Sequence, residues 1–153
     1  MKYTAKVLWN KLHDESFVDL KYHRKHQWKF DGGTVISASS SPLSVPVPMS
    51  DETAIDPEEA FIASLSSCHM LFFLSIAAKN NFTVKSYEDN AEGILNKNEQ
   101  GNIALTQITL NPMAVFEGTV IPTLEQIKQY HETAHKKCYI ANSVKSTIII
   151  NPV

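Results

Sequence analysis

The alternation of apolar and polar residues predicts a β-hairpin near the start of the chain. Within residues 24–30, lysine or glutamine alternates with histidine, tryptophan or phenylalanine, which is the period of two typical of a strand. Residues 31–33 (Asp-Gly-Gly) favour a turn, so residues 34–38 are expected to return as the partner strand. A further strand is predicted over residues 3–9, and residues 39–51, rich in proline and serine, are predicted to form a stiff loop.

A long helix is predicted from Pro57 to Lys79, because Asp56 suits the N-cap and Glu59 completes a capping box. Its apolar residues occur on almost every side, and a helix that is apolar all round must be buried all round. A chain of 153 residues has little material to cover a helix of this length, which is about 34 Å. We therefore expect a second copy of the chain to pack against it along a stripe of small residues, across a twofold axis.

The rest of the chain alternates strands with a second helix. Two strands, a helix capped by Thr123 and Gln126, and a final strand are predicted at residues 82–95, 103–115, 123–138 and 145–151. This order predicts an α+β fold, with a mostly antiparallel sheet over the helices. The length fits a single domain covering residues 1–153.

Composition and charge limit the kinds of partner and the cellular compartment that we expect for the chain. The net charge is −2 and Arg24 is the only arginine, so no basic surface typical of nucleic-acid binding is expected. The longest nearly apolar run, residues 70–78, is shorter than the roughly 20 residues of a membrane span. We expect a soluble, cytoplasmic protein, in which Cys68 and Cys138 stay reduced unless they perform redox chemistry.

Residues 131–135, His-Glu-Thr-Ala-His, match the HExxH pattern of zinc peptidases. Cys138 shares a helix face with His131 and His135, so these three side chains are a candidate zinc site. A cysteine thiolate as third ligand would quench the open coordination that catalytic zinc needs. We therefore expect no metal and no other cofactor, and treat zinc as an alternative.

The two cysteines offer the more informative chemistry. Cys138 is expected at the C-terminal end of a helix, where the helix dipole disfavours a thiolate, so Cys68 is the better candidate for attack. A cation about 4 Å from a thiolate contributes roughly 4 kcal/mol at an effective dielectric of about 20, or about three pKa units. Arg24 is the natural cation, and Glu58 is the carboxylate left free to hold it, since Glu59 serves the cap.

Helix geometry limits this arrangement. Glu58 and Cys68 are ten positions apart, which is about 15 Å along a straight helix. Either the helix is kinked, or Glu58 reaches the site from the second subunit. We favour a site that straddles the dimer interface. Trp28, Phe30 and residues 39–50 are candidate walls of the substrate pocket.

The motifs around both cysteines resemble those of the OsmC/Ohr family of thiol peroxidases. Residues 56–69 look like its first cysteine motif, residues 134–143 look like its second, and residues 22–33 are similar to the arginine-bearing strand of the OsmC-like branch. In one departure from much of the family, Tyr139 rather than proline follows the second cysteine. The resemblance implies an intertwined homodimer of α+β chains with long central helices.

The resemblance also implies a mechanism. Cys68 would attack an organic hydroperoxide, or hydrogen peroxide, and become a sulfenic acid. Cys138 would condense with it to a disulfide, and a dithiol reductant, such as a lipoyl group, would restore both thiols. Arg24 and Glu58 would organise the Cys68 thiolate.

A second reading comes from another class of protein. Dimers of the hot-dog type, which bind or hydrolyse acyl thioesters, also wrap antiparallel sheet around a long helix. In that case the cysteines would be passive and a carboxylate would act. Oxidation of both thiols by peroxide separates the two readings from each other.

Overall fold

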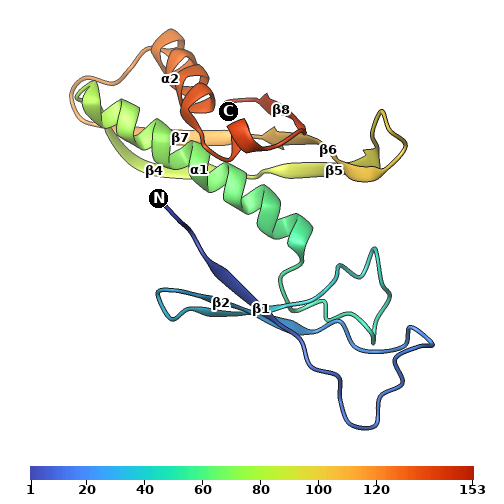
Figure 1. The fold of residues 1–153 in the computed structure, drawn as a ribbon. Helices are drawn as coiled ribbons and strands as arrows, with labels where there is room; N and C mark the ends of the chain where they lie inside the picture. Colours follow the sequence, from blue (N-terminus) through green and yellow to red (C-terminus); the bar gives the residue numbers. More distant parts are fainter. The chain divides into compact units, whose positions relative to one another are not determined.

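The computed structural model describes residues 1–153 and has the α+β composition predicted from the sequence (Figure 1). The elements are β1 (Ala5–Leu8), β2 (His26–Phe30), β3 (Val35–Ala38), α1 (Pro57–Lys79), β4 (Thr83–Asp89), β5 (Glu92–Lys97), β6 (Ile103–Leu110), β7 (Pro112–Glu117), α2 (Leu124–Lys137), the 3-10 helix η1 (Ala141–Ser143) and β8 (Thr147–Ile150). The chain divides into two compact units, Met1–Ala60 and Phe61–Val153, which we describe separately. The single domain over residues 1–153 therefore stays a prediction.

The N-terminal unit contains an antiparallel sheet in the order β1-β2-β3. β2 is central, and its Trp28 pairs with Val7 of β1 and Ile36 of β3. The predicted hairpin is confirmed: Gly33 lies in its turn at φ 87°, in the left-handed region that glycine adopts without strain. The segment after β3 contains no helix, as predicted, and only a single bridge joins Ala38 to Ile55.

Both ends of α1 lie where the sequence places them. The Glu59 amide donates to Asp56 Oδ1 at 2.7 Å, and the Asp56 amide donates to Glu59 Oε2 at 3.2 Å. This reciprocal capping box satisfies two amides that the first turn leaves without helical partners. At the other end, Asn81 has a φ of 62° and turns the chain toward β4.

The prediction of two continuous strands over residues 82–95 and 103–115 was wrong, because each is split in two. β4 pairs with β7, β5 pairs with β6, and β8 joins β6 in parallel. The breaks face each other around Asp89 and Asn111. The Asn111 amide donates to Asp89 Oδ1 at 2.7 Å, and its side chain donates to the Asn90 carbonyl at 2.9 Å. These side-chain hydrogen bonds take the place of backbone pairing where the two long strands are interrupted.

The core of the C-terminal unit lies against one face of α1. Its fully buried residues recur every four positions, at Leu65, His69, Phe73 and Ala77. On another side of α1, the small residues Ser64, Ser67, Ser75 and Ala78 are exposed in a single chain, together with Leu71, whose exposed fraction is 62%. By length and composition α1 would also be able to cross a membrane, and 22% of that segment is buried. One side of α1, which carries Leu71 and small residues, is therefore left without cover by its own chain.

Replacing Gly93 with alanine is expected to lower the free energy of unfolding by about 1–3 kcal/mol, as overpacking does. A Cβ at this position in β5 would lie 2.6 Å from Ile62 Cδ1 and 3.0 Å from Leu105 Cδ2, so both side chains would have to move. Urea unfolding measures the loss. Gly32→Ala is the control, since a Cβ there meets nothing within 4 Å; equal losses in the two variants would contradict the argument.

Candidate functional site

The structure brings the two cysteines together in the C-terminal unit. Cys68 comes from the middle of α1 and Cys138 from the C-cap of α2, and both belong to the apolar cluster around Leu65 and Ile108. Both are free thiols. Burial and a hydrogen bond to the Cys68 thiol raise the pKa of Cys138 to about 11. Two reduced thiols in one packed cluster are placed to form a disulfide when one of them is oxidised.

The two thiols differ in access, and the pKa of the buried thiol is raised. Cys138 is fully buried, whereas Cys68 is partly exposed. The thiolate is the form that attacks, and the raised pKa keeps Cys138 protonated at neutral pH. Access and protonation therefore both favour Cys68 as the thiol that meets a substrate and Cys138 as the thiol that follows.

The segment after Cys138 is held in place by one aromatic contact and several hydrogen bonds. Tyr139 packs edge-on against Phe72 of α1, with ring centroids 5.2 Å apart. The Asn142 side chain donates to the carbonyls of Lys136 and Cys138, at 3.0 and 2.9 Å. The Ala141 amide donates to Cys138 Sγ at 3.4 Å. These contacts fix the backbone on both sides of the buried thiol.

Arg24 and Glu58 both lie in the N-terminal unit, and the structure does not pair them. The Arg24 guanidinium donates to the carbonyls of Leu20, at 3.0 Å, and Tyr22, and it lies 3.6 Å from the centre of the Tyr22 ring. Glu58 is partly buried in the first turn of α1, and no ion pair joins it to Arg24. Since α1 is one continuous helix, Glu58 also stays about 15 Å along its axis from Cys68. One chain alone thus leaves Glu58 without either expected neighbour.

Sequence reasoning missed a buried pair of histidines beside the cysteines. Nε2 of His69 and Nδ1 of His131 lie 3.0 Å apart, and the two rings are parallel within 2°. Their exposed fractions are 1% and 2%. The ring of Phe73 stacks on His131 with a centroid separation of 4.2 Å. The available signal was the four-residue spacing of Leu65, His69 and Phe73, which places His69 on the buried face of α1.

Burial lowers the pKa of both His69 and His131 to about 4, so both rings are neutral at pH 7. His135 adds to the lowering at His69, and Asp89 opposes it. In a neutral pair one ring donates and the other accepts. His131, His135 and Cys138 form no group that could hold a metal ion, and neither does any other set of three such side chains in residues 1–153.

Stability is expected to fall as the pH drops from 6.5 to 5. The unfolded chain binds protons on these histidines near pH 6.5, whereas the folded chain resists until about pH 4. The stability is therefore fully present above pH 6.5 and is lost below it, by about 2 kcal/mol per ring at pH 5 at roughly 1.4 kcal/mol per pKa unit, which is about 4 kcal/mol for the two rings. Urea unfolding from pH 7.5 to 5 measures it.

Two variants make this pH test specific. His131→Asn should flatten the profile, because it removes one of the two buried titrating rings. His13→Asn should leave the profile unchanged, because the His13 side chain is 98% exposed. A flat profile in the unmodified protein, or an equal slope in His131→Asn, would contradict the assignment.

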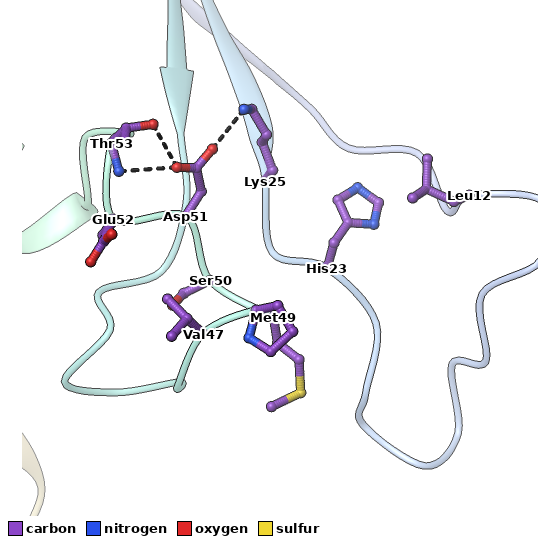
Figure 2. A pocket seen from close by; sticks show the side chains of 10 residues that line it. Leu12, His23, Lys25, Val47, Met49, Ser50, Asp51, Glu52 and Thr53 are labelled. Carbon is purple, nitrogen blue, oxygen red and sulfur yellow. Dashed lines mark hydrogen bonds and ion pairs between the residues drawn. The ribbon is translucent and has the colours of Figure 1, made fainter.

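The N-terminal unit contains a pocket of about 530 Å³ (Figure 2). It is lined by Leu12, His23, Lys25, Val47, Pro48, Met49, Ser50, Asp51, Glu52 and Thr53. Lys25 Nζ pairs with Asp51 at 2.6 Å (Figure 2), and Lys25 and Thr53 lower the pKa of Asp51 to about 2. Residues 47–50 are among the residues that line this pocket, whereas Trp28 and Phe30 are not; their place as walls of a substrate pocket stays a prediction.

Comparison with known proteins gives consistent matches. The family described as OsmC-like protein matches residues 50–152. An OsmC-like protein of unknown function from Vibrio cholerae is 51% identical, with a TM-score of 0.99, and the match covers 100% of this chain and 99% of that one. No curated protein sequence matches the chain.

More distant structures share the fold. An OsmC-like protein from Mycoplasma pneumoniae is 17% identical, with a TM-score of 0.74, and the match covers 100% of this chain and 96% of that one. The organic hydroperoxide resistance protein OhrB of Bacillus subtilis is 18% identical, with a TM-score of 0.65, and the match covers 98% and 96% of the two chains.

Proposed function

We propose that the chain, which belongs to the OsmC-like family, is a thiol-dependent peroxidase that reduces organic hydroperoxides. One observation carries the proposal: a partly exposed thiol, Cys68, packs against the apolar cluster that contains a buried, protonated thiol, Cys138. That arrangement suits a two-step oxidation in which one cysteine is oxidised and the other resolves it. The name of the Bacillus subtilis relative is consistent with this substrate class.

The reaction balances as follows. The Cys68 thiolate attacks one peroxide oxygen, the O–O bond breaks, and the alcohol leaves with a proton from solvent. Cys68 is now a sulfenic acid. Cys138 gives up its proton and attacks the sulfenic sulfur, which releases water and forms the Cys68–Cys138 disulfide. A dithiol then reduces this disulfide by thiol–disulfide exchange and is itself oxidised to a cyclic disulfide.

An assay with cumene hydroperoxide and dihydrolipoamide tests the proposal. We expect the protein to consume the two reagents in equal amounts. Glutathione should support slower turnover, because a monothiol must complete the exchange in two encounters. Consumption of neither reagent would contradict the proposal, and turnover of an acyl-CoA without thiol oxidation would favour the acyl-thioester alternative. Reduced cysteines and a dithiol reductant both fit the cytoplasm that we propose as its compartment.

We also propose that the active protein is a homodimer in which α1 of one chain covers α1 of the other. The exposed apolar and small side chains of α1 support this, because a single chain leaves them open to water. Charge is no obstacle, since the central part of the helix carries no Lys, Arg, Asp or Glu. In the dimer, Arg24 would supply the positive charge for the Cys68 thiolate, and Glu58 would reach the site from the second subunit.

Mixing two inactive variants tests the shared site. Cys68→Ser chains and Glu58→Gln chains, refolded together at equal ratio, are expected to recover about a quarter of the wild-type activity, because half of the dimers are mixed and each holds one intact site. If Glu58 acted within its own chain, no site in the mixed dimer would be complete. Absence of recovery, with mixed dimers demonstrated by mass spectrometry, would therefore rule out the second-subunit assignment.

A further inference from the structure

We propose that the buried hydrogen bond between His69 and His131 positions the resolving thiol, by holding α2 in register on α1 so that Cys138 meets Cys68. The use of this contact in turnover rests on the proposed function. The contact itself lies within the C-terminal unit, so its effect on the two thiols can be measured without any peroxide.

The pair joins the two elements that carry the cysteines. His69 directly follows Cys68 on α1, and His131 precedes Cys138 by seven residues on α2. Seven residues are about two helical turns, so His131 and Cys138 lie on the same face of α2, about 10 Å apart along its axis. A shift or rotation of α2 that broke the histidine contact would therefore move Cys138 relative to Cys68 as well.

Among the helical residues Pro57–Lys79 and Leu124–Lys137, this is the one side-chain hydrogen bond that joins α1 to α2. The other aromatic contacts of His131 and its neighbours are apolar: Phe73 stacks on His131 and meets the ring of Tyr130 at 6.4 Å. Apolar contacts tolerate sliding, whereas a hydrogen bond weakens steeply with distance and angle. Because both rings are buried, water offers no replacement partner, and the low local dielectric strengthens the bond.

The other ring nitrogen of His69 makes its orientation depend on this one contact. Nδ1 of His69 is buried and has no partner, so the bond through Nε2 is the only one that orients this ring. If α2 turned away, both nitrogens of His69 would be unsatisfied inside the core, which costs more than the loss of a solvated hydrogen bond. The register of the two helices is therefore tied to this single pair of atoms.

The equilibrium between the Cys68–Cys138 disulfide and dithiothreitol tests the proposal. The two thiols lose two electrons and two protons, and oxidised dithiothreitol takes them up. The double variant His69→Leu/His131→Leu removes both partners together, so its urea midpoint should change little. Its equilibrium constant for disulfide formation should fall at least tenfold, which is about 30 mV for a two-electron couple. Alkylation of free thiols followed by intact mass gives the ratio.

Two single variants separate positioning from packing. His131→Asn keeps a hydrogen-bonding atom close to the place of Nδ1 and should retain the wild-type constant. His131→Gln carries its amide one bond further from the backbone than Nδ1 of histidine. Its equilibrium constant for disulfide formation should therefore fall as that of the double variant does. Their comparison also decides the matter if the double variant is unstable.

A wild-type equilibrium constant in the stable double variant would overturn the proposal, and so would equal constants in His131→Asn and His131→Gln. If the variants show the expected equilibrium constants but the thiols do not react with hydroperoxide, the positioning role of the histidine contact is supported. The peroxidase function is then refuted.

Discussion

Cys68→Ser is expected to abolish hydroperoxide reduction, by more than about a thousandfold, as the loss of a catalytic nucleophile generally does. Serine has nearly the same shape, but its hydroxyl does not ionise near neutral pH, and the thiolate is the reactive form. Cys138 cannot take over, because it is buried and its pKa is about 11. At pH 7 only about one such thiol in ten thousand is ionised.

The measurement is the initial rate of cumene hydroperoxide loss with a dithiol present. The urea midpoint of Cys68→Ser should match that of the wild type, which shows that the loss is chemical rather than structural. An activity of one tenth of wild type or more in this variant would contradict the assignment of Cys68.

Cys138→Ser is expected to separate the two steps of the reaction. Cys68 should still react with the first equivalent of hydroperoxide, but no disulfide can form. The chain should gain about 16 Da, the mass of one oxygen, and excess hydroperoxide should add further oxygens as the sulfenic acid passes to sulfinic acid. Such a variant loses activity within a few turnovers, whereas the wild type is protected because its disulfide forms first.

Intact mass after one and after ten equivalents of hydroperoxide measures this difference, and a sulfenic-acid trap such as dimedone identifies the residue. Resistance of Cys138→Ser to ten equivalents of hydroperoxide, equal to that of the wild type, would remove Cys138 from the mechanism.

Signals local in the sequence were enough to predict most of the secondary structure. The capping box of Asp56 and Glu59 and that of Thr123 and Gln126 both form as the sequence indicates, because they involve residues only three positions apart. The split of the long hairpin was not predictable in this way. It depends on Asp89 and Asn111, which are far apart in sequence and meet only when the strands pair.

The residues of the candidate site were likewise predicted where the signal is local in the sequence and missed where it is not. Cys68 and Cys138 were singled out by their helix positions and by motif, and the structure places them in contact. The histidine pair was missed, because nothing within either helix indicates that His69 and His131 face each other across 62 positions. The roles of Arg24 and Glu58 stay predictions, since a single chain does not bring them together.

The intact mass of the reduced wild-type protein after one equivalent of an organic hydroperoxide is the most direct test of Cys68 as the attacking thiol and Cys138 as the resolving thiol. We expect a loss of two hydrogens, with a linked peptide that joins Cys68 to Cys138 after digestion. If both thiols stay reduced while the hydroperoxide remains unconsumed, the chain is not a thiol peroxidase.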